Sequence, residues 1–254
     1  MNSILRYIIL TAMRDWLYVG LLLILIAAFG ISVLLGSTAL VERAQMTIIY
    51  IAGSGRMIFA VGMILFVCFH VRRSFDNKEV EFILSKSIAR HKFILAYLLG
   101  FILVATMILL PIILFVLIMG GNKIGLIFWS ASILSEMLII ITFAILSSLI
   151  LKSAVSSVLA TLGFYILARM MGFFVLTIKL PESVNDISSL DKVLHSFLKI
   201  LSFIFPRLDL FAKSDWLIYG ITNYSGFAII LIQSLIYIPL MISMAFYDFK
   251  KKQF

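Results

Sequence analysis

The chain alternates between long apolar blocks and short polar segments. A stretch of about 20 apolar residues crosses a lipid bilayer as a helix, and five plain blocks of this kind cover residues 16–35, 93–119, 124–151, 154–178 and 225–246. Another block begins at Thr47 or at Arg56 and ends near Val71, and we favour the later start because an arginine at mid-bilayer is costly. The pattern predicts an all-α integral membrane protein with about six spanning helices, in one domain over residues 1–254.

Two of the polar segments are predicted to be helical. Between the second and third blocks, Phe75, Glu79, Phe82, Ile83 and Lys86 recur at helical spacing, which predicts a short amphipathic helix able to dock a partner. Between the fifth and sixth blocks, the apolar residues of 190–201 follow the same spacing. That pattern predicts a second amphipathic helical segment at the membrane surface.

Lysine and arginine residues predict how the spans are oriented. Both ends of the chain, the 72–92 segment and the link near residue 152 carry most of the positive residues near the spans. The short loops on the opposite side carry only Arg43, Arg56 and Lys123. Because positive residues gather in short cytoplasmic loops, we expect cytoplasmic termini, a cytoplasmic 72–92 segment and an extracytoplasmic 190–201 segment.

Composition agrees with a membrane protein and argues against other classes. The chain is 63% hydrophobic and 13% charged, with a mean hydropathy of +1.16, whereas soluble domains are about half apolar and a quarter charged. The net charge of +9 lies at the ends of the apolar blocks, so it indicates orientation and not nucleic-acid binding. The three histidines are scattered and the single cysteine is Cys68, so we expect neither a metal site nor an intrachain disulfide.

Two charged residues fall deep inside the predicted spans. Glu136 lies about 12 residues from the outer end of its span and Arg169 about nine, which places both roughly 14 to 18 Å deep. An unpaired charge at that depth costs at least about 2.5 kcal/mol, so we expect the two residues to pair. The pair either ties the two helices together or lines a polar path across the membrane.

The charged segment also carries a family resemblance. Residues 81–90, Glu-Phe-Ile-Leu-Ser-Lys-Ser-Ile-Ala-Arg, resemble the cytoplasmic segment of type-2, exporter-like permeases of ATP-binding-cassette (ABC) transporters. In that family a glutamate begins a short apolar helix, and a turn ending in an arginine leads into the third span. Glu81 and Arg90 match this glutamate and arginine, whereas Ser87 stands where the family usually has proline.

The resemblance implies a permease that works as a dimer, with a second copy or a homologous permease, in a bacterial inner (plasma) membrane. Two cytoplasmic ABC ATPase subunits would bind ATP and magnesium, and the permease itself would need no cofactor and catalyse no reaction. The chain has no phosphate-binding Gly-x-x-x-x-Gly-Lys-Ser/Thr sequence. The expected ATPase-docking residues are Phe75, Glu79, Glu81, Phe82, Ile83 and Arg90.

Other interpretations stay open. The 72–92 segment also fits an ordinary basic loop that anchors two spans. A membrane-embedded enzyme acting on lipid or peptide would need polar residues clustered at one depth, for which only Glu136 and Arg169 qualify. A membrane scaffold or assembly factor would tolerate the exchange of the 75–92 segment for another basic loop.

Overall fold

The computed structural model describes residues 2–40, 42–80, 90–179, 196–198, 200–201, 204–221 and 224–251. These residues are mostly helical, and no strand occurs among them. Six of their helices are long and apolar enough to cross a membrane. They are α2 (Trp16–Ser37), α3 (Arg43–Asp76), α5 (Arg90–Ile118), α6 (Lys123–Ile150), α7 (Ala154–Lys179) and α10 (Tyr224–Lys251). The predicted all-α membrane fold with about six spans is confirmed.

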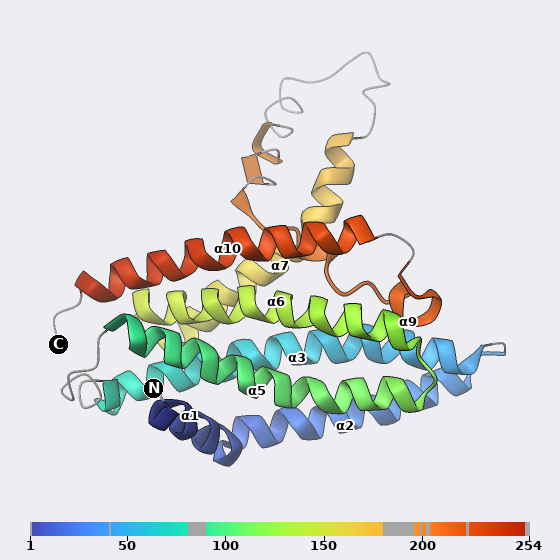
Figure 1. Cartoon of the computed structure of the whole chain (residues 1–254), viewed down its shortest axis with the longest axis horizontal. Helices are drawn as coiled ribbons and strands as arrows, with labels where there is room; N and C mark the ends of the chain where they lie inside the picture. Colours follow the sequence, from blue (N-terminus) through green and yellow to red (C-terminus); the bar gives the residue numbers. More distant parts are fainter. Residues whose placement is uncertain are drawn as a thin grey trace.

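Helices α3 and α6 form the centre of the bundle, and α2, α5 and α10 run alongside them (Figure 1). The spanning parts of α6 and α3 are 72% and 61% buried, whereas that of α10 is only 17% buried. Helix α7 crosses the bundle, and its C-terminal half projects beyond it (Figure 1). The two central helices are therefore shielded by protein, and the outer helices turn large apolar faces outward.

Helix α3 begins earlier than predicted. It runs unbroken from Arg43, so the favoured start near Arg56 is wrong, and Arg56 lies inside the bundle with 2% of its surface exposed. A helix of 34 residues is about 51 Å long, which exceeds the roughly 30 Å of bilayer hydrocarbon. The cost that favoured the later start applies to an unpaired arginine, whereas a buried partner offsets much of it.

Local sequence signals explain several helix ends. Asp15 caps the start of α2 by accepting a hydrogen bond from the Leu17 N–H, and Asn122 caps α6 in the same way through the Gly125 N–H. Gly120 adopts a positive φ of 84° in the turn between α5 and α6. Only residues 151–153 separate α6 from α7, so these two helices form the predicted hairpin.

A short amphipathic helix, α1 (Asn2–Arg14), precedes the first span. It packs on α5 through Ile8 and Ala12, which are fully buried, and it leaves Tyr7, Leu10 and Met13 exposed. The pattern of apolar blocks does not predict this helix, because α1 is too short and too polar to cross a membrane. Its exposed apolar side chains suit a position at the membrane surface.

The segment before α10 folds back onto the bundle. It contains the 3-10 turn η1 (Leu208–Leu210), which packs on α7, and the short helix α9 (Asp215–Tyr219), which packs on α6 and α3 (Figure 1). The predicted helix over 190–201 falls largely outside the described residues. The described part of this range, 196–198 and 200–201, is helical. Residues 208–219 therefore lie against α3, α6 and α7, whereas the helical residues before them stand beside the projecting half of α7 (Figure 1).

Both ends of the chain lie at the same end of the bundle, together with residues 77–80 and the turn between α6 and α7 (Figure 1). The turns that join α2 to α3 and α5 to α6 lie at the opposite end, as does α9 (Figure 1). This arrangement agrees with six spans. The assignment of the first end to the cytoplasm stays a prediction from the distribution of positive charge.

Gly125 lets α9 lie directly on α6, since a Cβ atom there would collide with the backbone carbonyl of Trp216. We expect Gly125→Ala to lower the free energy of unfolding by about 1–3 kcal/mol, as overpacking does. The control Gly30→Ala places its Cβ in open space and replaces a poor helix former, so its stability should stay equal or rise slightly. Thermal unfolding of both variants in detergent tests this, and equal midpoints would contradict it.

Candidate functional site

The centre of the bundle holds an ion pair between Arg56 of α3 and Glu136 of α6. The Oε2 atom of Glu136 accepts a hydrogen bond from Arg56 Nε at 2.7 Å and lies 2.6 Å from Arg56 Nη2. Arg56 is 2% exposed and Glu136 is fully buried. Opposite charges attract strongly in an interior of low dielectric constant, and this attraction offsets the cost of removing them from water.

Arg56 also holds the segment that precedes α10. Its Nη1 donates to the carbonyl of Ala212 and its Nη2 donates to the carbonyl of Leu208, each at 3.2 Å. From α6, the hydroxyl of Ser132 accepts the Ala212 N–H at 2.7 Å. The backbone at the start of η1 and just after it is therefore attached to α3 and α6 by hydrogen bonds that are shielded from solvent.

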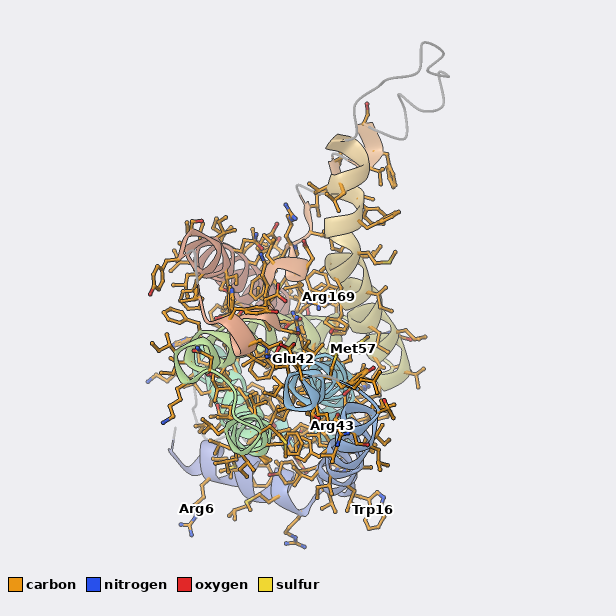
Figure 2. The ribbon with its side chains drawn as sticks, turned by 90° about the vertical axis from the view of Figure 1, so that its right-hand side faces the viewer. Arg6, Trp16, Glu42, Arg43, Met57 and Arg169 are labelled. Carbon is orange, nitrogen blue, oxygen red and sulfur yellow. The ribbon has the colours of Figure 1, made fainter. Side chains whose placement is uncertain are left out.

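Arg169 of α7 belongs to the same cluster, and it lies where α7 meets the bundle (Figure 2). Its Nη1 donates to the Leu208 carbonyl at 2.9 Å, so this one oxygen accepts from both arginines. Among the described residues the ion-pair partner of Glu136 is Arg56, so the predicted pairing of Glu136 with Arg169 is wrong. The prediction compared depths along α6 and α7 and had placed Arg56 outside the hydrocarbon.

We call Arg56, Glu136, Arg169 and the carbonyls of Leu208 and Ala212 the charge cluster. Two guanidinium groups face a single carboxylate there, and the carbonyl dipoles supply further negative potential. Asp209 adds to it from η1: its carboxylate pairs with Arg207 at 2.9 Å and interacts electrostatically with Arg169. The excess positive charge is thus balanced by acceptors from the segment that covers the bundle.

Two buried polar atoms next to the ion pair have no hydrogen-bond partner among the described residues. They are the Oε1 atom of Glu136 and the hydroxyl of Tyr165, which lies within electrostatic range of Glu136, Arg56 and Arg169. Most buried polar groups in folded proteins do have partners. The charge cluster therefore retains hydrogen-bonding capacity that its own side chains do not use.

A second polar group, the hydroxyl cluster, lies between the same three helices near the turn that joins α6 to α7. Ser147 Oγ and Thr161 Oγ1 are 2.9 Å apart, and the Sγ of Cys68 lies 3.7 Å from the same threonine oxygen. Ser157 donates to the Ser147 carbonyl at 3.4 Å. The sequence analysis missed this cluster, although Ser157 and Thr161 stand four residues apart on one helix face. Polar groups thus occur at two depths along the contact of α3, α6 and α7.

The predicted ATPase-docking residues are only partly described. Glu81, Phe82 and Ile83 lie outside the described residues, as does the side chain of Arg90, the first residue of α5. Their docking role stays a prediction.

The two docking residues whose side chains are described contact other parts of this chain. Phe75 makes an edge-to-face contact with Phe249 of α10, with ring centroids 6.4 Å apart. Glu79 lies against Tyr7 of α1, where burial, followed by the nearby Glu79 carboxylate, raises the pKa of the tyrosine hydroxyl. Tyr7 accordingly stays protonated and neutral at physiological pH. Both residues link the end of α3 to neighbouring helices.

The charge cluster is suited to hold one conformation. The Arg56 ion pair and both carbonyl contacts form only when α3, α6 and the segment around η1 occupy these relative positions, and the Arg169 contact adds α7 to the same condition. Among the described residues no group of three His, Cys, Asp or Glu side chains could hold a metal ion. The described chemistry is therefore that of charge pairing and hydrogen bonding.

Removing one member of the ion pair leaves the other charge buried without compensation. We expect Glu136→Leu to lower the free energy of unfolding by about 3–5 kcal/mol. The double variant Arg56→Met/Glu136→Leu should recover most of this loss, because neither charge is then buried alone. Thermal unfolding of the wild type, both single variants and the double variant gives the coupling energy. Strictly additive losses would show that the two side chains do not interact.

Arg169 makes a charged hydrogen bond to a carbonyl, whereas Arg56 makes two such bonds and an ion pair. We expect Arg169→Met to cost about 1.5–3 kcal/mol of unfolding free energy, less than Arg56→Met does. Arg169→Lys should recover part of the loss, since it keeps a donor and a charge. The same unfolding measurement ranks the variants, and a greater loss in Arg169→Met than in Arg56→Met would overturn the ranking.

The structure thus joins three spanning helices to the segment before the last one through Arg56, Glu136 and Arg169. The carbonyls of Leu208 and Ala212 accept the hydrogen bonds that the two arginines donate. In comparisons with known proteins, no protein-family model matches this chain, and no curated protein does.

Proposed function

We propose that this chain is the membrane-spanning permease subunit of an ABC transporter. It acts with a second permease, is driven by separate cytoplasmic ATPase subunits and moves its substrate outward. The resemblance of residues 81–90 to type-2 permeases suggests this function. The observation that supports it best is a continuous mechanical connection between the predicted docking segment and the charge cluster.

Helix α3 provides that connection. It runs without a break from Arg43 to Asp76, so Arg56 in the charge cluster and Phe75 beside the docking segment belong to one helix. At 1.5 Å per residue the two are about 28 Å apart along the axis. A displacement of the Phe75 end of α3 is therefore transmitted to the ion pair along one continuous helix.

Aromatic contacts join this end of α3 to its neighbours. The ring of Phe249 on α10 contacts Phe75 of α3 and stacks on Phe93 of α5, with centroids 6.4 and 5.6 Å apart. The Tyr97 hydroxyl donates to Ser74 at 3.2 Å, and the Tyr97 ring packs on Phe93. Since α3 precedes the docking segment and α5 follows it, a force on that segment moves α3, α5 and α10 together.

The charge cluster is the receiving end of this movement. A shift of α3 against α6 separates Arg56 from Glu136 and weakens its bonds to the Leu208 and Ala212 carbonyls. The segment around η1 is then released from the bundle, and the polar groups of α3, α6 and α7 become accessible. In this scheme ATP binding and hydrolysis on the partner subunits alternately break and restore the cluster.

The test is to purify the chain with an ABC ATPase encoded beside it, reconstitute the complex in vesicles and measure ATP turnover. Phe249→Ala should leave the complex assembled and lower the permease-dependent turnover by about 2- to 30-fold, since residues along a coupling path contribute about 0.5–2 kcal/mol. The control is Leu235→Ala, because Leu235 lies on the same helix and is 77% exposed. It should behave as the wild type.

Two results would count against the proposal. Failure of any such ATPase to co-purify would favour a scaffold or an enzyme over a permease. Assembly with unchanged turnover in Phe249→Ala would keep the permease but reject the aromatic contacts as the route of coupling.

A further inference from the structure

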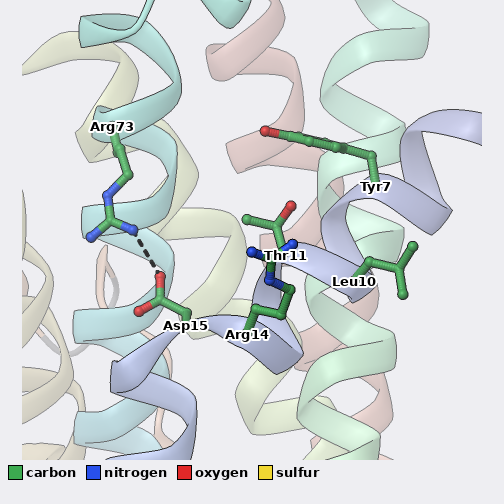
Figure 3. A pocket seen from close by; sticks show the side chains of 6 residues that line it. All are labelled: Tyr7, Leu10, Thr11, Arg14, Asp15 and Arg73. Atoms are coloured by element: carbon green, nitrogen blue, oxygen red, sulfur yellow. Dashed lines mark hydrogen bonds and ion pairs between the residues drawn. The ribbon is translucent and has the colours of Figure 1, made fainter.

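Helices α1 and α2 meet at a bend around Asp15, which we call the elbow. A pocket of about 390 Å³ lies at this elbow, next to the end of α3 (Figure 3). Three of the residues that line it are charged, and the others are a tyrosine, a threonine and a leucine. They are Tyr7, Leu10, Thr11, Arg14, Asp15 and Arg73. The pocket is separate from the charge cluster, since neither Arg56, Glu136 nor Arg169 lines it.

The charges in this pocket leave it positive. Both oxygens of Asp15 are already engaged: Oδ1 accepts the Leu17 N–H at 3.0 Å, and Oδ2 accepts Arg73 Nη1 at 3.1 Å (Figure 3). Arg73 therefore keeps further N–H donors, and its side chain is 58% exposed. Among the described residues Arg14 has no carboxylate partner. Two guanidinium groups with spare donors thus line the pocket together with one carboxylate, and both oxygens of that carboxylate are engaged.

The surroundings of the pocket are apolar. Trp16 follows the elbow directly, is 83% exposed and projects from the bundle (Figure 2). Val19, Leu23 and Ile26 continue the same exposed face along α2. Tryptophan at a membrane protein surface marks the level of the lipid headgroups. The positive pocket therefore lies at headgroup level, directly above a stripe that faces acyl chains.

We propose that this elbow binds an anionic phospholipid, with the phosphate held by Arg14 and Arg73 and the acyl chains lying along α2. Guanidinium groups bind phosphate oxygens by short, charge-assisted hydrogen bonds, whereas the Tyr7 hydroxyl is engaged by Glu79 and only shapes the wall of the pocket. Asp15 orients Arg73 and caps α2 at the same time. A free phosphate ion would match the arginines alone, whereas a phospholipid matches both the arginines and the apolar stripe.

The chemistry of the bilayer supports the same ligand. Anionic lipids are concentrated in the cytoplasmic leaflet, where basic pockets between helices bind their headgroups. The predicted orientation places the elbow in that leaflet. The bound lipid would bridge α1 to the end of α3, since Arg14 ends α1 and Arg73 lies in the last turn of α3.

The experiment measures quenching of Trp16 fluorescence by brominated lipids around the full chain in phosphatidylcholine vesicles. Trp129 and Trp216 are buried, so Trp16 is the tryptophan that meets lipid. We expect brominated phosphatidylglycerol to quench about fivefold more effectively than brominated phosphatidylcholine, and Arg14→Gln to remove most of this preference. Arg6→Gln is the matched control, because Arg6 is an exposed arginine of the same helix outside the pocket.

Three outcomes would overturn the proposal. Equal quenching by the two lipids would show that the elbow does not select anionic headgroups. An equal loss in Arg6→Gln and Arg14→Gln would indicate general attraction to a charged surface. If added inorganic phosphate abolished the preference, the pocket would bind the free anion instead of the lipid. Unfolding midpoints of both variants equal to that of the wild type would confirm that the comparison concerns folded protein. The measurement needs no ATPase, so it is independent of the proposed transport function.

Discussion

A charged side chain inside a bilayer has to find its counter-charge within the protein, and this constraint organises the structure. The ion pair of Arg56 and Glu136 requires α3 and α6 to lie next to each other at one depth. The donors that Arg56 has left require acceptors, which the backbone of Leu208 and Ala212 provides. The segment before α10 therefore folds onto the bundle, and α9 follows it onto the ends of α3 and α6.

Helix α3 takes part in two groups of contacts that have different properties. Polar contacts gather between α3, α6 and α7, in the charge cluster and in the hydroxyl cluster around Thr161. A group of aromatic contacts around Phe249 joins one end of α3, α5 and α10. Apolar packing tolerates the exchange of side chains of similar volume, whereas charges in a low dielectric constant demand particular partners. Helix α3 belongs to both groups, which is why we regard it as the connecting element.

The elbow at Asp15 adds a third connection to α3. Helix α1 is anchored on α5 by Ile8, which packs closely over Gly100, and Asp15 pairs with Arg73. The exposed side of this elbow meets the membrane through Trp16 and the apolar face of α2. Helix α3 thus contributes Arg56 to the charge cluster near its middle. Near its end it contributes Phe75 to the aromatic contacts and Arg73 to a surface suited to lipid headgroups.

The sequence by itself determined the fold class, because apolar blocks of bilayer length have few alternatives to spanning helices. It also indicated the hairpin of α6 and α7 and identified Glu136 and Arg169 as charges inside the predicted spans. Only the tertiary structure decided that Glu136 pairs with Arg56, that Arg169 binds the Leu208 carbonyl, and that Cys68, Ser147 and Thr161 meet. Helical spacing gives the depth and the face of a side chain along one helix. The partner of a buried charge depends instead on which helices pack together and on which backbone carbonyls the segment before α10 brings to them.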